Sequence, residues 1–247
     1  MHQRATLRPY QSDLKGGIYE AWNGGARNVL AVLPTGAGKT VTFSDIIHDH
    51  TGASCVVAHR QELVIQISLA LASDHVRHRI IGPTNVVKLC VAEHMREIGE
   101  SYYDPRAVCA VAGIDTLVRR KEALAEWLST VTLWVQDEAH HVLRKNKWGI
   151  GVEMFPNAYG LGVTATAMRA DGNGLGRHAD GVFDVVVEGP CGRDLINAGY
   201  LADYRIFAPP LDLDLTEVPI SGQTGDFNPQ KLKRAIRKSR IVGDVVD

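Results

Sequence analysis

Two short runs of this chain hold the residue types that bind and cleave phosphates. Residues 33–40 read Leu-Pro-Thr-Gly-Ala-Gly-Lys-Thr, and residues 137–140 read Asp-Glu-Ala-His. Glycines at positions 36 and 38 permit a tight turn whose backbone N–H groups point at phosphate oxygens, and a lysine adds positive charge. The adjacent acids of the second run can hold a metal ion and activate water. Together the two runs predict binding and hydrolysis of a nucleoside triphosphate.

The first run is predicted to cradle the phosphates and to open a helix whose positive dipole end strengthens the binding. We expect the Lys39 ammonium to lie between the β- and γ-phosphates and the Thr40 hydroxyl to ligate Mg²⁺. Leu33 stands where the general phosphate-loop pattern has glycine. A glycine-rich turn that binds nothing is the alternative, and the strand–turn–helix context argues against it. The predicted nucleotide-binding residues of this run are Thr35, Gly36, Ala37, Gly38, Lys39 and Thr40.

The second run directly follows an apolar strand, so its acids emerge where that strand ends. We expect Asp137 to hold Mg²⁺ through water and Glu138 to be the general base that orients the attacking water. Adjacent carboxylates point in different directions, which suits one to the metal and the other to the water. An acid-rich helix start is the alternative. With Lys39, these two acids form the predicted catalytic set.

The elements that must position these residues are indicated by short apolar runs that alternate with longer segments of helical spacing. This alternation predicts βαβ units and a three-layer αβα domain with a mainly parallel central sheet, in which ligands bind beyond the carboxyl ends of the strands. The predicted strands are residues 28–33, 54–58, 107–111, 132–136 and 158–164, and the predicted helices are residues 39–50, 61–72, 86–98 and 115–128. Both chemical runs therefore begin directly after a predicted strand.

The domain organisation is indicated by a change of composition near residues 209–210. We predict one domain over residues 1–208 and, over 209–247, a connector that reaches toward a further domain. Residues 211–229 resemble a loop, and residues 231–240 contain six lysines and arginines. That basic stretch is either a solvated helix face or a contact to nucleic acid.

Composition excludes a chain that is basic throughout. Lysine and arginine number 27 against 28 acidic residues, so any surface for nucleic acid must be a local patch. The four cysteines are widely spaced, which predicts free thiols and a cytoplasmic protein. The sequence has no apolar run long enough to cross a membrane. Trp127 and Trp134 are expected in the core, and most histidines, His75 and His78 among them, are expected to be exposed.

The motifs, taken in order, resemble the first RecA-like domain of a superfamily-two DEAD/DEAH-box DNA helicase over residues 5–208, and RadD-like bacterial and phage helicases most of all. Residues 169–175 and 195–201 add to the latter likeness. Residues 7–11 resemble the adenine-recognition element, with Arg8 and with Gln11 as the base-reading side chain. The elements that contact the nucleic-acid backbone are resembled by the stretches that contain Arg60, Gln61 and Thr116. The elements that couple hydrolysis to strand movement are resembled by the stretches that contain His140, Thr164 and Thr166.

The resemblance implies ATP and Mg²⁺ as cofactors, single-stranded or branched DNA as partner, and a second RecA-like domain that completes the ATP site with arginines. This chain alone is therefore expected to hydrolyse ATP very slowly and not to unwind DNA. One departure is Ala167, where the family usually has proline after Thr-Ala-Thr. Because proline would stiffen the turn, alanine puts coupling efficiency in doubt.

Several alternatives stay open at this point. The chain could be the motor of a restriction or other nuclease complex, or a non-motor binding module gated by ATP. Tyr10 could pack on the nucleotide or on the core. Arg60 could be a plain surface residue, and Thr116 could cap its helix instead of contacting a phosphate.

Overall fold

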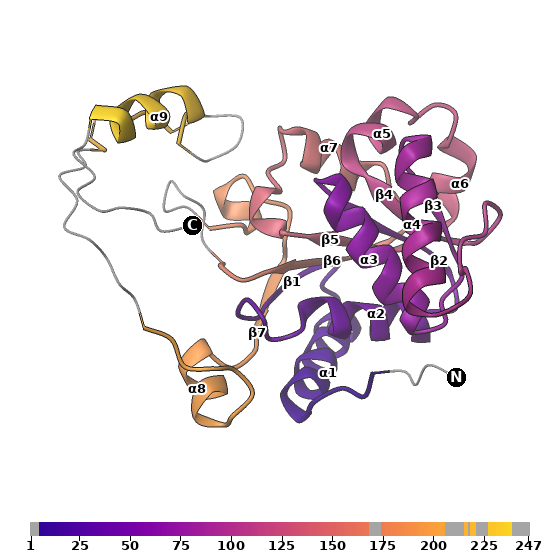
Figure 1. The fold of residues 1–247 in the computed structure, drawn as a ribbon, viewed down its shortest axis with the longest axis horizontal. Coiled ribbons are helices and arrows are strands. Elements are labelled where there is room, and N and C mark those ends of the chain that lie inside the picture. Colours follow the sequence, from indigo (N-terminus) through magenta and orange to yellow (C-terminus); the bar gives the residue numbers. More distant parts are fainter. Residues whose placement is uncertain (1–4, 168–173, 206–214, 217, 221–226, 239–247) are drawn as a thin grey trace.

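The computed structural model describes residues 5–167, 174–205, 215–216, 218–220 and 227–238. Its centre is a seven-stranded sheet, parallel throughout, with the order β3-β4-β2-β5-β6-β1-β7 (Figure 1). The strands are β1 (Asn28–Val32), β2 (Ala53–Ala58), β3 (His78–Ile81), β4 (Cys109–Gly113), β5 (Val131–Asp137), β6 (Tyr159–Thr164) and β7 (Val185–Glu188). The predicted α/β class with a parallel sheet is confirmed.

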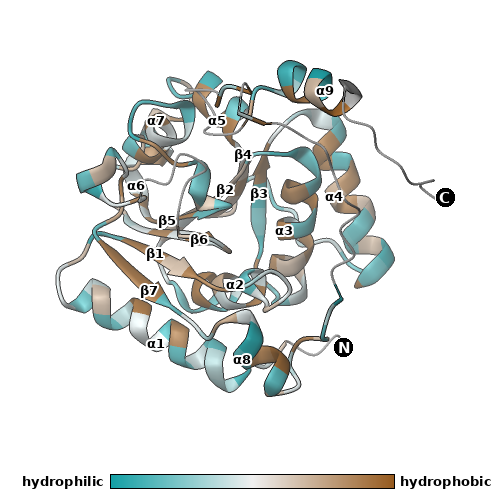
Figure 2. Cartoon of the chain, turned by 90° about the vertical axis from the view of Figure 1, so that its left-hand side faces the viewer, coloured by the Kyte–Doolittle hydropathy of each residue, from teal (hydrophilic) through white to brown (hydrophobic). Residues whose placement is uncertain are grey.

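Helices cover both faces of the sheet, and strand side chains alternate between the two resulting cores. On β1, Val29 and Ala31 join the core under α1 (Pro9–Asn23), α2 (Lys39–Asp49), α3 (Gln61–Ser73) and α4 (Thr84–Glu97). Leu30 joins the core under α5 (Ile114–Arg119), α6 (Ala125–Thr130) and α7 (Lys147–Glu153). Figure 2 shows the hydrophobic central strands enclosed between these two sets of helices. The three predicted layers are therefore present.

The remaining elements lie at the edges or outside the layers. They are η1 (Ala139–His141), η2 (Arg177–Ala179), α8 (Gly192–Asn197) and α9 (Pro229–Lys238). Residues 206–214 lie outside the described part of the chain, and so do residues 168–173 and 239–247. The domain boundary at residue 208 thus stays a prediction.

The sequence prediction erred where a segment lacks a clear hydrophobic period. Strands β3 and β7 were not predicted, because each has only four residues and the edge strand β7 is largely exposed. Helices α1, α7 and α8 were likewise not predicted as elements. The single helix expected over 115–128 is wrong: residues 120–124 form a turn between α5 and α6. Residues 119–122 are four consecutive exposed charges, which leave no apolar face to hold a helix there.

Two histidines are buried, contrary to expectation, in a polar network between α3, β3 and α4. His78 and His94 are both fully buried and share the Ser68 hydroxyl, at 2.7 and 3.0 Å from their Nε2 atoms. His78 Nδ1 donates to the Val76 carbonyl at 2.8 Å, and the Tyr102 N–H donates to His94 Nδ1 at 3.3 Å. With both rings neutral, Ser68 donates to His78 Nε2 and accepts from His94 Nε2.

This network predicts a loss of stability in mild acid. Burial lowers the pKa of His78 from 6.5 to about 4, and it lowers the pKa of His94 as well. As the pH falls below 6.5, His78 becomes protonated in the unfolded chain but stays neutral in the folded one. The folded state therefore loses stability until the pH reaches the pKa of His78 in the folded state. We expect the free energy of unfolding to fall by about 2 kcal/mol between about pH 7 and pH 5 from His78 alone.

Urea titrations of the chain at both pH values measure this difference. The control is His178→Gln, which removes an exposed histidine and should keep the full loss. Equal stability at the two pH values would show that His78 is not held neutral.

The cysteines and the tryptophans lie as the sequence predicts. Cys55, Cys90 and Cys109 are free and buried, and Cys191 is free and exposed. Trp134 is buried and Trp127 packs at the edge of the second core, as expected. Throughout the part of the chain that the structure describes, no helix has both the length and the hydropathy needed to cross a membrane.

Candidate active site

The sheet order brings the two chemical runs to one edge. β6 pairs with β5 on one side and with β1 on the other, so Asp137 lies opposite Val163 and Val32 opposite Thr164. The loop that follows β1 is tied to this edge, because the Leu33 N–H donates to the Thr164 carbonyl at 3.0 Å. The predicted phosphate loop and the acidic pair therefore meet across the carboxyl end of β6.

The loop between β1 and α2 has the backbone that the glycines predict. Gly36 and Gly38 have φ values of 79° and 84°, in the left-handed region that favours glycine. A Cβ at residue 38 would also collide with the Gln11 amide. Gly38 is the N-cap of α2, so Lys39 and Thr40 lie in its first turn, where N–H groups have no partner within the helix. Such a loop suits an anion.

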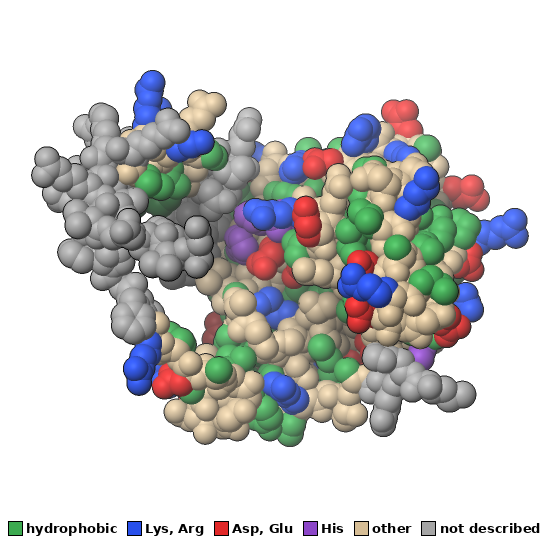
Figure 3. Space-filling model, viewed as in Figure 1, with side chains coloured by type: hydrophobic (Ala, Val, Ile, Leu, Met, Phe, Trp, Pro, Cys, Tyr) green, Lys and Arg blue, Asp and Glu red, His purple; other side chains and the backbone are tan. Residues whose placement is uncertain are grey.

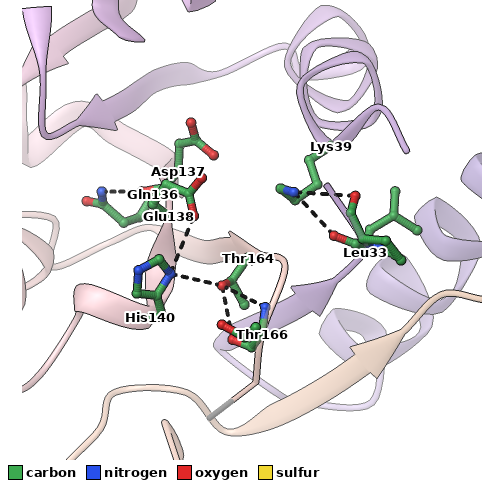
Figure 4. Close-up of polar contacts among 9 residues, drawn as sticks. Leu33, Lys39, Gln136, Asp137, Glu138, His140, Thr164 and Thr166 are labelled. Carbon is green, nitrogen blue, oxygen red and sulfur yellow. Dashed lines mark hydrogen bonds and ion pairs between the residues drawn. The ribbon is translucent and has the colours of Figure 1, made fainter. Parts of the chain in front are cut away.

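Lys39 reaches across this loop toward the acidic pair (Figure 4). Its Nζ donates to the carbonyls of Leu33 and Pro34, at 3.2 and 3.5 Å. Neutral carbonyls are weaker partners for an ammonium than phosphate oxygens. The geometry therefore fits a triphosphate laid along the loop.

Asp137 is a buried acid that fits a metal site. Asp137 is 7% exposed. Burial raises the pKa of its carboxyl group, and repulsion from Glu138 raises it further. The backbone N–H of Glu138 and the charges of Lys39 and His140 lower it in part. A divalent cation would stabilise the charged carboxylate further. Lys39 and Asp137 extend toward each other from opposite sides of this site (Figure 4).

Glu138 begins a connected set of polar side chains. It has φ 52°, an uncommon value for a residue other than glycine, and its side chain is partly exposed. The Glu138 Oε2 atom lies 3.4 Å from His140 Nδ1, which lies 3.2 Å from the Thr164 hydroxyl. That hydroxyl donates to the Thr166 carbonyl at 3.0 Å and accepts from the Thr166 N–H. The structure thus brings the predicted catalytic acid and the predicted coupling residues into contact.

The N-terminal element packs directly against the phosphate loop. The Tyr10 hydroxyl and the Gln11 amide nitrogen both donate to the Ala37 carbonyl, each at 2.9 Å. The Gln11 amide oxygen accepts from the Arg8 N–H at 2.8 Å. Gln11 is only 3% exposed, whereas Arg8 is exposed. Tyr10 is buried and supports the loop, which answers the question that the sequence left open.

The residues predicted to contact nucleic acid line one pocket. Arg60, Gln61 and Thr116 lie around a pocket of about 200 Å³ at the carboxyl ends of β2, β3 and β4. Arg60 and Gln61 are exposed, while Thr116 is mostly buried. Gly82 and Pro83 also line the pocket, but sequence reasoning missed them because β3 was not predicted.

A row of ring contacts connects this pocket with the acidic pair. His140 lies 4.1 Å from His141 and His141 lies 5.3 Å from His59, measured between ring centroids, and His59 directly precedes Arg60. Trp148 of α7 packs beside His59 and His141. Burial, followed by the charge of Arg60, lowers the pKa of His59. Histidine, basic and acidic side chains gather on the same face near the end of β5 (Figure 3). In the sequence, the pair of adjacent histidines after Ala139 is the feature that could have indicated these ring contacts.

The chain is also similar to known proteins. Residues 4–169 match the ResIII family, described as the res subunit of type III restriction enzymes. This chain belongs to the ResIII family. The match covers the phosphate loop, the acidic pair and the pocket around Arg60.

Two relatives of this chain are yeast proteins. One, from Schizosaccharomyces pombe, is named as a mitochondrial ATP-dependent helicase, irc3; it is 24% identical over 97% of this chain and 38% of its own length. The other, from Saccharomyces cerevisiae, is named as an ATP-dependent helicase, IRC3; it is 26% identical over 86% of this chain and 30% of its own length. The chain thus spans about a third of the length of these relatives.

A solved structure shares the fold. The UvsW helicase of bacteriophage T4 superposes with a TM-score of 0.54 at 18% identity, over 75% of this chain and 61% of that one. The predicted RecA-like αβα fold is confirmed by this likeness, and the family match covers residues 4–169.

Proposed function

We propose that this ResIII chain supplies the first motor domain of an ATP-dependent DNA helicase or translocase. The observation that carries the proposal is the continuous contact along one sheet edge. It runs from Leu33 of the phosphate loop through Thr164 to His140, which also contacts Glu138, and on through His141 to His59 beside Arg60. An ATP site and a nucleic-acid pocket joined in this way can influence each other, as a motor requires.

In the proposed site, the chain's own groups bind and orient the nucleotide. Residues 35–40 hold the triphosphate, with N–H groups of the first turn of α2 and the Lys39 ammonium as donors. Thr40 and Asp137 would hold Mg²⁺, which supplies positive charge against the phosphates when it is bound.

Glu138 is the proposed general base, which orients the attacking water and accepts its proton. Its contact with His140 passes the state of the site to Thr164 and Thr166, the proposed coupling residues. Ala167, which follows them, leaves this turn free of a proline constraint.

DNA is proposed to lie over the pocket at the ends of β2–β4, held mainly through its phosphates. Arg60 is an exposed cation there, Gln61 is an exposed donor, and Thr116 supports the wall. We propose single-stranded or branched DNA as the substrate and a RadD-like role, on the strength of the motifs. Since the relatives are longer, a second RecA-like domain is the proposed partner within the whole protein.

Arg60→Ala tests the DNA side of this proposal. We expect it to weaken binding of single-stranded DNA by about tenfold and to reduce the slope of log K against log salt by roughly 0.7, because one phosphate contact is lost. Fluorescence anisotropy at several salt concentrations measures both quantities. Arg106→Ala, which removes an exposed arginine outside the pocket, is the matched control. An unchanged salt slope in Arg60→Ala would place the DNA elsewhere.

A restriction or nuclease complex is the second candidate, and the description of the ResIII family favours it. Such a complex would use the same motor site. DNA cleavage that depends on ATP, by the whole protein, would support this candidate, whereas unwinding without cleavage would support the first. ATP-dependent DNA binding with no stimulation of hydrolysis would instead indicate a gated binding module.

A further inference from the structure

The segment that follows α8 returns to the nucleotide edge of the domain. Gly199, with φ 76°, turns the chain, and the N–H groups of Tyr200 and Leu201 both donate to the Leu195 carbonyl, at 2.8 and 3.2 Å. The Leu195 side chain is buried in the first core. Tyr200 and Leu201 are therefore held in place by a residue that is itself anchored.

Tyr200 contacts the N-terminal element through Arg8. The centre of the Arg8 guanidinium lies 5.2 Å from the centroid of the Tyr200 ring, within the range of a cation–π contact. Arg8 also donates to the Tyr200 carbonyl and to the Tyr10 hydroxyl, each at 3.3 Å. The Tyr10 and Tyr200 rings meet edge to face, with centroids 5.0 Å apart. The guanidinium is thus supported by a ring and two oxygens, although Arg8 is exposed to solvent.

The same group of residues contacts the phosphate loop. The Tyr10 hydroxyl donates to the Ala37 carbonyl, and the Leu201 side chain lies 3.4 Å from where a Cβ of Gly36 would stand. Gln11 binds Ala37 as well, but it is buried, with one amide hydrogen and one lone pair of its oxygen committed. Arg8, in contrast, is exposed at this end of the loop and open to a nucleotide base.

We propose that Tyr200 positions Arg8 as a stacking surface for the adenine base, beside Gln11. A guanidinium is planar, so one face can rest on the Tyr200 ring while the other meets the base. Holding the arginine in place beforehand reduces the ordering that nucleotide binding would otherwise require. This inference rests on the proposed ATP site and adds Tyr200 as a residue that positions the base-stacking arginine there.

Tyr200→Ala tests the inference in this chain, with fluorescent ATP and inorganic tripolyphosphate as probes. We expect the Kd for ATP to rise about tenfold, because the support of one cation–π contact is lost. The Kd for tripolyphosphate should stay within about twofold, because the phosphate loop is untouched. Tyr200→Phe keeps the ring and should restore ATP affinity.

Tyr204→Ala is the matched control. Tyr204 lies in the same segment and also contacts an arginine, Arg193, at 5.7 Å, but the structure does not place that pair against the loop. Its removal should leave both affinities unchanged. If Tyr200→Ala does not fold, Arg8→Lys carries the test, since it keeps the charge and removes the planar group; it should show the same selective loss.

Wild-type ATP affinity in Tyr200→Ala would overturn the inference, and so would equal losses for ATP and tripolyphosphate, which would indicate a structural role. Failure of the ATP site itself has a different signature. In that case the wild-type chain would bind neither probe, or the Lys39→Ala variant would bind both probes as tightly as the wild type does.

Discussion

Glu138→Gln is expected to bind Mg-ATP as the wild type does and to hydrolyse it about 10²–10⁴-fold more slowly. The substitution replaces a carboxylate that can accept a proton with an amide of nearly the same size that cannot. The left-handed backbone of residue 138 is equally accessible to both side chains, so the change should not disturb the turn. The loss should therefore appear in the rate of the chemical step and not in nucleotide affinity.

The partner variant Lys39→Ala should show the opposite pattern, with ATP binding itself lost, because Lys39 is the cation that the loop offers to the phosphates. Fluorescent-nucleotide titration and a phosphate-release assay separate the two variants. Glu153→Gln, an exposed glutamate on α7, is the control and should hydrolyse ATP normally. Wild-type hydrolysis in either Glu138→Gln or Lys39→Ala would refute the assigned roles.

Local sequence predicts the phosphate loop and the acidic pair well, because each is set by adjacent residues. The backbone turns at Gly38, where the Gln11 amide leaves no room for a Cβ, and Asp137 ends a buried strand. The alternation of apolar runs likewise predicts the layers, because burial on a parallel sheet imposes it.

Residues whose surroundings come from distant segments could not be predicted in this way. Gln11 is predicted as the base-reading side chain, and its second contact, the donation of its amide N–H to the loop carbonyl of Ala37, could not be read from the sequence. His78 looks like a surface residue, yet Ser68 and His94 enclose it. Tyr200 is separated from the phosphate loop by more than half of the length of the chain, and the packing of α8 brings it to Arg8. Such contacts depend on the fold as a whole.

The chain alone is expected to hydrolyse ATP about 10³–10⁵-fold more slowly than the whole protein, because arginines that stabilise the transferring phosphoryl group contribute that much. The charge of Lys39 lowers the pKa of Asp137 in part, and an arginine of a second RecA-like domain would add positive charge to the site. The yeast relatives, which extend far beyond this match, have room for such a domain.

The expected difference lies in turnover and not in binding, because the phosphate loop and the Arg8–Tyr200 pair belong to this chain. Single-turnover hydrolysis by this chain and by the whole protein, at saturating ATP and with single-stranded DNA, measures the ratio. DNA unwinding should be found only with the whole protein. Equal turnover, or unwinding by the chain alone, would mean that Lys39 and Glu138 complete the site without help from a second domain.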